Sequence, residues 1–220
     1  MNKIAIIIAS DQGAKQALII RQELPHAELY STVEREHCTR IDSISSFVFE
    51  QLTHYDTFVF IGALGICVRA IAPCVHSKYT DPAVINIDAS GNHVISVLSG
   101  HVGGANQMTL RLAAILGADP VITTQSDNNS LWALDTLGQT YNWKTTSTSS
   151  LNTVISHFVN LHPIALLLDV KDEGTRFMER TAPEHEKIFY HFEDINLQQF
   201  ETLIAVTPYI YQSPIPTLYY

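Results

Sequence analysis

The fold class is indicated most clearly by residues 94–116, which read VISVLSGHVGGANQMTLRLAAIL. The run 93–98 is apolar and β-branched, which predicts a strand, and the spacing of apolar residues over 107–116 predicts an amphipathic helix. Three glycines and one histidine lie between these two elements. A strand that passes through a glycine-rich turn into a helix is typical of an α/β protein.

The residues before this stretch predict a sheet that is mostly parallel. Residues 83–88 form a further strand, and the turn 89–92 joins it to 93–98 as a β-hairpin. Strand and helix patterns alternate upstream of the hairpin, which favours an open, three-layer sheet with helices on both faces. The predicted strands are 4–9, 28–31, 57–61 and, after the hairpin, 120–123, and the predicted helices are 11–24, 44–52 and 62–71.

A change in composition near residue 130 predicts two domains. Residues 1–130 form the N-terminal α/β domain with the glycine loop, and residues 131–220 form a smaller α/β domain. In the smaller domain, 130–137 predicts a short helix, 164–169 and 203–207 predict strands, and TTSTSS at 145–150 is typical of a linker or a helix start. The tail QSPIPTLYY, 212–220, has two prolines and is expected to be a connector.

Composition excludes several classes of function. The formal charge of −9 repels phosphate backbones, so broad nucleic-acid binding is not expected. Three cysteines without CxxC spacing favour reduced thiols and a cytoplasmic protein. The apolar run after Met1 is too short to span a bilayer, so no membrane association is expected. Ten histidines without HExxH spacing predict no metal site.

The glycine loop is the first candidate site. Glycines allow close backbone approach, and the free N–H groups of a helix start favour an anion, so a carboxylate or an oxyanion could bind there. His101 is the candidate for proton transfer because its ordinary pKa lies near working pH. A structural or solvated histidine is an equally ordinary interpretation.

Two further segments carry candidate residues. Within 68–88, Arg69 and Lys78 could hold carboxylates and Asp81 could orient a base or a water, although a solvated face and an Asp-Pro turn are the commoner explanation. Within 120–127, Thr123, Thr124 and Asp127 follow a strand and could bind substrate in the crevice at its carboxyl end. Such a cluster is equally normal as a helix cap.

Four segments, in this order and spacing, resemble the CbiG family, the cobalt-precorrin-5A hydrolases. They are GALGICVRAIAP (62–73), KYTDPAVINID (78–88), ISVLSGHVGGAN (95–106) and LGADPVITTQSD (116–127). The resemblance is dense over residues 57–127. It implies that water opens the δ-lactone of cobalt-precorrin-5A and that the two-carbon bridge leaves as acetaldehyde, which gives cobalt-precorrin-5B. It implies no cofactor, because the cobalt belongs to the substrate.

The resemblance also implies which residues form the site. The expected catalytic residues are His101, Asp81 and Asp127. The residues expected to bind substrate are Arg69, Lys78, Ser99, Gly100, Gly103, Gly104, Asn106, Thr123 and Thr124. In the expected mechanism, the N–H groups of Gly103 and Gly104 stabilise the oxyanion.

The sequence departs from the family pattern in two respects. Gln125 and Ser126 replace the usual alanine and threonine. The family's C-terminal domain, which opens with a Gly-Ile-Gly-Cys-type strand, is not expected here, so a separate C-terminal-domain protein or a pathway methyltransferase is a candidate partner, and a homodimer stays open. Two other functions stay open as well: a noncatalytic corrinoid-binding module, and a nucleotide- or sugar-phosphate-binding α/β protein.

Overall fold

The structure, a computed structural model, describes residues 3–220. These residues form two compact units, which divide between Thr124 and Gln125, six residues before the boundary that the sequence favours. None of the helices in this part of the chain has the length and apolar character needed to cross a membrane.

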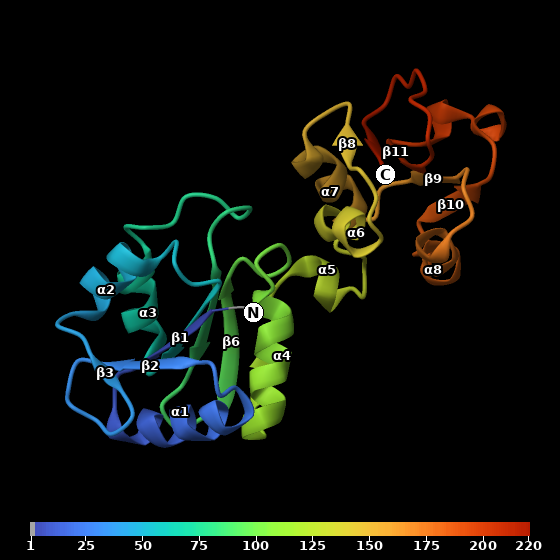
Figure 1. Cartoon of the computed structure of the whole chain (residues 1–220). Helices are drawn as coiled ribbons and strands as arrows, with labels where there is room; N and C mark the ends of the chain where they lie inside the picture. The colour runs from blue at the N-terminus through green and yellow to red at the C-terminus, as the bar shows by residue number, and fades with distance from the viewer. Residues whose placement is uncertain (1–2) are drawn as a thin grey trace. The chain divides into compact units, whose positions relative to one another are not determined.

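The first unit is built on a seven-stranded sheet with the order β3-β2-β1-β4-β5-β6-β7 (Figure 1). Strands β1 to β5 are parallel, whereas β6 is antiparallel to β5, and β7 is parallel to β6. The strands are β1 (Ile4–Ile8), β2 (Glu28–Ser31), β3 (Thr39–Arg40), β4 (Thr57–Ile61), β5 (Ala83–Ile87), β6 (His93–Leu98) and β7 (Asp119–Val121).

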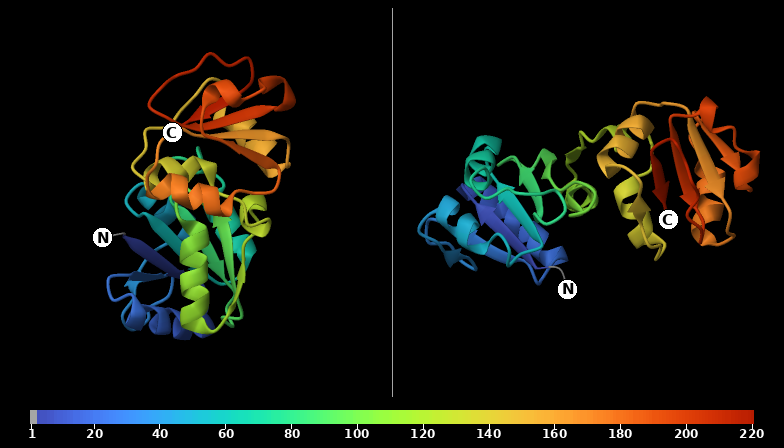
Figure 2. Two further views of the ribbon diagram at one scale, coloured as in Figure 1. Left: turned by 90° about the vertical axis from the view of Figure 1, so that its right-hand side faces the viewer. Right: turned by 90° about the horizontal axis from the view of Figure 1, so that it is seen from above.

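Four helices cover the sheet in three layers, as the sequence predicts (Figures 1 and 2). Helices α1 and α4 contribute to the apolar core on one face, and α2 and α3 contribute to the core on the other. The central strands β1 and β4 are buried on both faces, which explains their continuous apolar sequence. The helices are α1 (Asp11–Glu23), α2 (Ile44–Gln51), α3 (Leu64–Ile71) and α4 (Ala105–Leu116).

The hairpin between β5 and β6 determines which edge of the sheet carries the glycine loop. Asp88 holds the turn, because its carboxylate accepts the N–H groups of Ser90 (3.0 Å) and His93 (2.6 Å). Since β6 and β7 run opposite to the other strands, the segments that follow them lie at the edge where β4 and β5 begin. The glycine loop therefore lies at the amino ends of most of the parallel strands, not at their carboxyl ends.

The second unit has a five-stranded sheet with the order β10-β9-β11-β12-β8, parallel except at β8. Its strands are β8 (Thr146–Ser147), β9 (Ile164–Leu168), β10 (Glu186–Phe189), β11 (Thr202–Val206) and β12 (Thr217–Tyr219). Its helices are α5 (Gln125–Asn128), α6 (Leu134–Thr140), α7 (Leu151–Val159), α8 (Glu173–Thr181) and the short 3-10 helices η1 (Phe192–Asp194) and η2 (Leu197–Gln199). The predicted helix at 130–137 is displaced, because residues 131–133 are not helical.

The expectation that the chain ends in a connector is wrong. Residues 217–219 form β12, which pairs with β11 and β8, and Leu218 is fully buried. Both prolines lie just before the strand, where a missing N–H removes no hydrogen bond from the sheet, and the carbonyl of Pro216 accepts the N–H of Leu203 (3.0 Å). The prolines therefore mark the start of a strand.

Glu186, on β10 in the second unit, is half-buried as a residue, but both oxygens of its carboxylate are buried. Neither of its carboxylate oxygens has a hydrogen-bond partner among residues 3–220. Burial raises the pKa of this carboxyl from its ordinary value of 4.5 to about 8. The folded chain therefore keeps this proton at a pH where the unfolded chain has lost it.

We predict that Glu186→Gln removes a pH dependence of stability. As the pH rises from 4.5 to about 8, the unfolded chain releases the proton and the folded chain does not, so the wild type loses stability across this window. The variant has no proton to lose at this position. Its Tm should therefore exceed that of the wild type at about pH 8 and match it near pH 4.5. Exposed Glu184→Gln is the control, and an equal gain in both variants would contradict the assignment.

Candidate functional site

The loop 99–104 is wound tightly onto the start of α4. Ser99 adopts a left-handed conformation (φ 57°), and Gly104 does the same (φ 81°). The N–H of Gly104 donates to the carbonyl of His101 (3.0 Å), and that of Ala105 donates to Ser99 (3.1 Å). The N–H of Asn106 donates to Gly100 (3.0 Å). The loop thus supplies acceptors for the first donors of the helix, which a helix start otherwise leaves unsatisfied.

These bonds change one expectation. Gly104 was expected to stabilise an oxyanion through its N–H group, but the carbonyl of His101 already accepts that hydrogen bond. An anion could take it only if the turn opened. The simple anion cradle that the sequence suggests is therefore not formed by Gly104, Ala105 or Asn106.

The glycines of the loop have a steric role. A Cβ atom on Gly103 would lie 2.5 Å from the Cβ of Ser99 and 3.3 Å from the backbone nitrogen of Ala83. A Cβ on Gly100 would lie 2.8 Å from Oδ1 of Asn106. Contacts this short leave no room for a side chain, so both glycines let the loop pack against β5 and α4.

Asn106 joins the predicted segments in one polar network. Its side chain is almost fully buried, with 6% exposed. Oδ1 accepts the hydroxyl of Ser96 on β6 (2.6 Å), and Nδ2 donates to Oγ1 of Thr124 (3.0 Å). The amide thus connects β6, α4 and the segment after β7. Asn106 and Thr124 were predicted from sequence, whereas Ser96 was not, because a serine within a strand gives no distinctive signal.

Asp81 lies on the other side of the loop. Its Oδ2 accepts the N–H groups of His76 (2.8 Å) and Ser77 (2.9 Å), and these bonds hold the segment before β5. Asp81 also lines a hollow of about 360 Å³ together with Val102 and Gly103. The structure therefore brings Asp81 and the glycine loop to one hollow at the amino end of β5.

The remaining predicted residues differ in their surroundings. His101 is partly buried at the tip of the loop, and Ser99 is buried with no hydrogen-bond partner for its Oγ among residues 3–220. Arg69 is exposed on α3, and its Nη1 turns back to the carbonyl of Gly65 (3.4 Å). The Nζ atom of Lys78 lies 5.0 Å from the ring of Tyr79.

Thr123 is exposed directly after β7. Asp127, by contrast, lies in the second unit, on α5. Eleven of the twelve predicted residues therefore lie in the first unit, and Asp127 lies in the second.

Three hollows larger than the one beside Asp81 lie in the second unit. One of about 480 Å³ is lined by Asp127, the predicted residue that the second unit contains. The other two lie beyond the carboxyl ends of the parallel strands. The first of these two, of about 680 Å³, has the aromatic side chains of Trp143, Tyr209, Tyr219 and Tyr220 in its lining. The other, of about 530 Å³, contains Lys171 and Arg176. Sequence reasoning missed both, because their residues come from separated loops, and no predicted site residue lines either of them. We assign the candidate site to the first unit because the steric and hydrogen-bond constraints converge there.

The fold and the loop define a class: a two-unit α/β protein whose glycine loop packs beside the loop that carries Asp81, at the amino end of a mostly parallel sheet. Residues 46–127 match the family described as "Cobalamin synthesis G N-terminal", and residues 132–220 match "Cobalamin biosynthesis central region". The chain belongs to the CbiG family and carries its N-terminal and central domains.

Individual relatives agree with this assignment. A protein of Salmonella typhimurium named cobalt-precorrin-5A hydrolase is 59% identical over 88 residues, 40% of this chain and 25% of its own length. One of Priestia megaterium with the same name is 40% identical over 135 residues, 61% of this chain and 36% of its own. The chain thus spans only about a quarter to a third of these relatives.

A solved structure has the same fold. It is that of a cobalamin biosynthesis protein G homolog from Sulfolobus solfataricus, with a TM-score of 0.54 and 21% sequence identity. The similarity covers 99% of this chain and 59% of that one. It confirms the fold class of two mostly parallel α/β sheets.

We predict that Gly103→Ala destabilises the first unit by about 2–4 kcal/mol, because the new methyl group must displace backbone atoms of Ser99 and Ala83. Urea unfolding followed by circular dichroism measures the change. Gly117→Ala is the matched control, since nothing lies within 4 Å of its added Cβ and only its φ of 64° is unfavourable. That control should lose about 1 kcal/mol, and equal losses in both variants would contradict the packing role.

Proposed function

We propose that this chain takes part in the hydrolysis of cobalt-precorrin-5A, in which the δ-lactone opens and acetaldehyde is released. The observation that carries the proposal is that Asp81 and the glycine loop line one hollow at the amino end of β5, the edge at which Asn106 also holds Thr124. The two relatives described above are named for this hydrolase activity, which supports the choice of substrate.

The proposed chemistry begins with water. His101 accepts a proton from the water as its oxygen attacks the lactone carbonyl, and the ring opens when the carbon–oxygen bond to the leaving alkoxide breaks. The alkoxide oxygen then becomes the carbonyl oxygen of acetaldehyde. At the same time the bond between the alkoxide carbon and the macrocycle breaks, and the conjugated macrocycle receives the electron pair of that bond. The cobalt is part of the substrate, so the protein supplies no cofactor in this scheme.

The surrounding residues have distinct roles in the proposal. Asp81 is a positioning residue, because its carboxylate fixes the backbone of His76 and Ser77 beside the hollow. Arg69 and Lys78 provide exposed positive charge for substrate carboxylates in a chain whose net charge is −9. Asn106 keeps Thr124 beside the loop, with the two side chains 3.0 Å apart.

A noncatalytic corrinoid-binding module is the second candidate. It is favoured by the fact that the chain covers 25% of one relative and 36% of the other. In that case residues 3–220 bind cobalt-precorrin-5A, and turnover needs a C-terminal domain or a partner protein. A nucleotide or sugar phosphate fits less well, because the loop's own carbonyls accept the N–H groups of Gly104, Ala105 and Asn106.

We predict that His101→Ala lowers acetaldehyde release by about 100-fold or more, because the variant lacks the proposed general base. The assay is anaerobic incubation of the full chain with cobalt-precorrin-5A, followed by mass analysis of both products. His26→Ala, an exposed histidine of the same unit, is the control and should retain full activity.

Each outcome decides between the candidates. Undiminished release by His101→Ala would exclude His101 as the base. A rise in Tm on addition of cobalt-precorrin-5A, without acetaldehyde from the wild type, would favour the binding module. Stabilisation by nucleotides but not by the corrinoid would overturn the proposed substrate class.

A further inference from the structure

Helix α7 ends in a backbone motif that brings two histidines together. Leu161 follows the helix in a left-handed conformation (φ 60°). Its N–H donates to the carbonyl of Phe158 (3.2 Å), and the N–H of His162 donates to that of His157 (3.0 Å). This pair of bonds is a Schellman motif, in which the first and last residues usually make an apolar contact. Here both positions are histidine.

The two imidazole rings are stacked as a result. Their centroids are 4.9 Å apart, and the ring planes differ by 9°. A left-handed conformation is unfavourable at a residue other than glycine, yet Leu161 adopts it here. The backbone, not only the side-chain rotamers, thus fixes the two rings next to each other.

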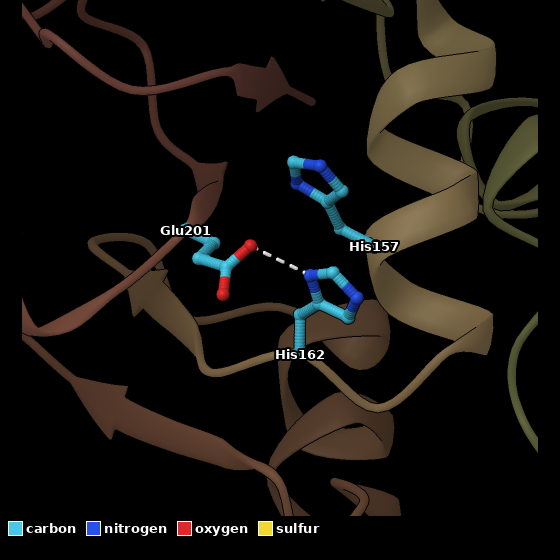
Figure 3. A group of neighbouring side chains, drawn as sticks. All are labelled: His157, His162 and Glu201. Atoms are coloured by element: carbon cyan, nitrogen blue, oxygen red, sulfur yellow. Dashed lines mark hydrogen bonds and ion pairs between the residues drawn. The ribbon is translucent and has the colours of Figure 1, made fainter.

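The start of β11 adds an acid to this pair. Nδ1 of His162 lies 2.6 Å from Oε2 of Glu201 (Figure 3). Nδ1 of His157 lies 2.7 Å from Oγ1 of Thr202. The N–H of Glu201 donates to the carbonyl of Pro163 (2.9 Å), which holds this strand beside the end of α7. Ring nitrogens of both histidines and a carboxylate oxygen of Glu201 lie within 4.8 Å of one another.

These donors suit a transition-metal ion better than a simple ion pair. Imidazole and carboxylate are ordinary ligands of Zn²⁺, and tetrahedral donors around it are about 3.4 Å apart, so rotation of the side chains by little more than 1 Å would bring them into range. Thr202 is fully buried and orients the ring of His157, as partners of metal-bound histidines do. The side chains of His162 and Glu201 are 37% and 53% exposed, which leaves a route for the ion and for a water ligand.

We propose that His157, His162 and Glu201 form a binding site for a divalent transition-metal ion of the Zn²⁺ type. The bound ion would link the end of α7 to the start of β11 within the second unit. All three ligands belong to the second unit, whereas His101 and Asp81 of the proposed hydrolase chemistry belong to the first. It departs from the sequence-based expectation of no metal site, since the ligands are separated by 5 and 39 positions and match no metal-binding motif.

Calorimetric titration of the metal-free full chain with Zn²⁺ tests the proposal. We expect one tight site per chain and a higher Tm with Zn²⁺, and Mg²⁺ at the same concentration should have no effect because it disfavours imidazole. His157→Ala and His162→Ala should each weaken the site by about 10-fold or more. Glu201→Gln, which preserves size, should weaken it too, and Co²⁺ in the wild type should give the visible absorption of a tetrahedral complex.

The controls separate this site from scattered surface histidines. His191→Ala removes an exposed histidine of the same unit and should leave Zn²⁺ binding unchanged. Comparison of circular dichroism spectra and of the metal-free Tm values identifies any variant that has failed to fold. If a histidine variant fails to fold, Glu201→Gln still tests whether the site binds Zn²⁺. Equal Zn²⁺ affinity in the three ligand variants, the control and the wild type would overturn the proposal. Binding of Zn²⁺ without any rise in Tm would contradict the link between α7 and β11.

Discussion

The close approach of backbone segments at Gly103 is the constraint on which the first unit depends. A Cβ atom there would come within 2.5 Å of the Cβ of Ser99, so only glycine allows the loop to turn back on itself at this point, and it would lie 3.3 Å from the backbone nitrogen of Ala83 at the start of β5. The start of α4, the buried Asn106 and the hollow beside Asp81 lie next to this turn. The reversal of β6 relative to β5 places that turn at the amino end of the parallel strands.

This arrangement changes how the site can recognise a negatively charged substrate. The loop uses the backbone donors of Gly104, Ala105 and Asn106 for its own structure, so the dipole of α4 is partly satisfied before any ligand arrives. In the proposed function, recognition therefore relies on side chains and on the shape of the hollow. These hydrogen bonds make the loop rigid. A proton transfer by His101 requires such a fixed position of its side chain.

Much of the fold could be predicted from the sequence, because buried strands and amphipathic helices leave strong patterns. The hairpin before His93 and the helix of Leu112 are examples, and the same segments led to the family. Short strands such as β12 could not be predicted, since three residues carry no periodicity and prolines obscure them. The use of the loop's N–H groups was also hidden, because it depends on the left-handed turn at Ser99, a conformation unusual for serine. The pairing of His162 with Glu201 depends on tertiary contacts between distant segments.

The central claim is that the amino-end edge of the first sheet binds the corrinoid. Hydrogen–deuterium exchange with and without cobalt-precorrin-5A, under anaerobic conditions, tests it most directly. We expect amide exchange in residues 76–83 and 99–106 to become slower when cobalt-precorrin-5A is added. Protection confined to the opposite edge, around Ser10, Gly62 and the turn that follows Asp88, with the glycine loop unchanged, would contradict it.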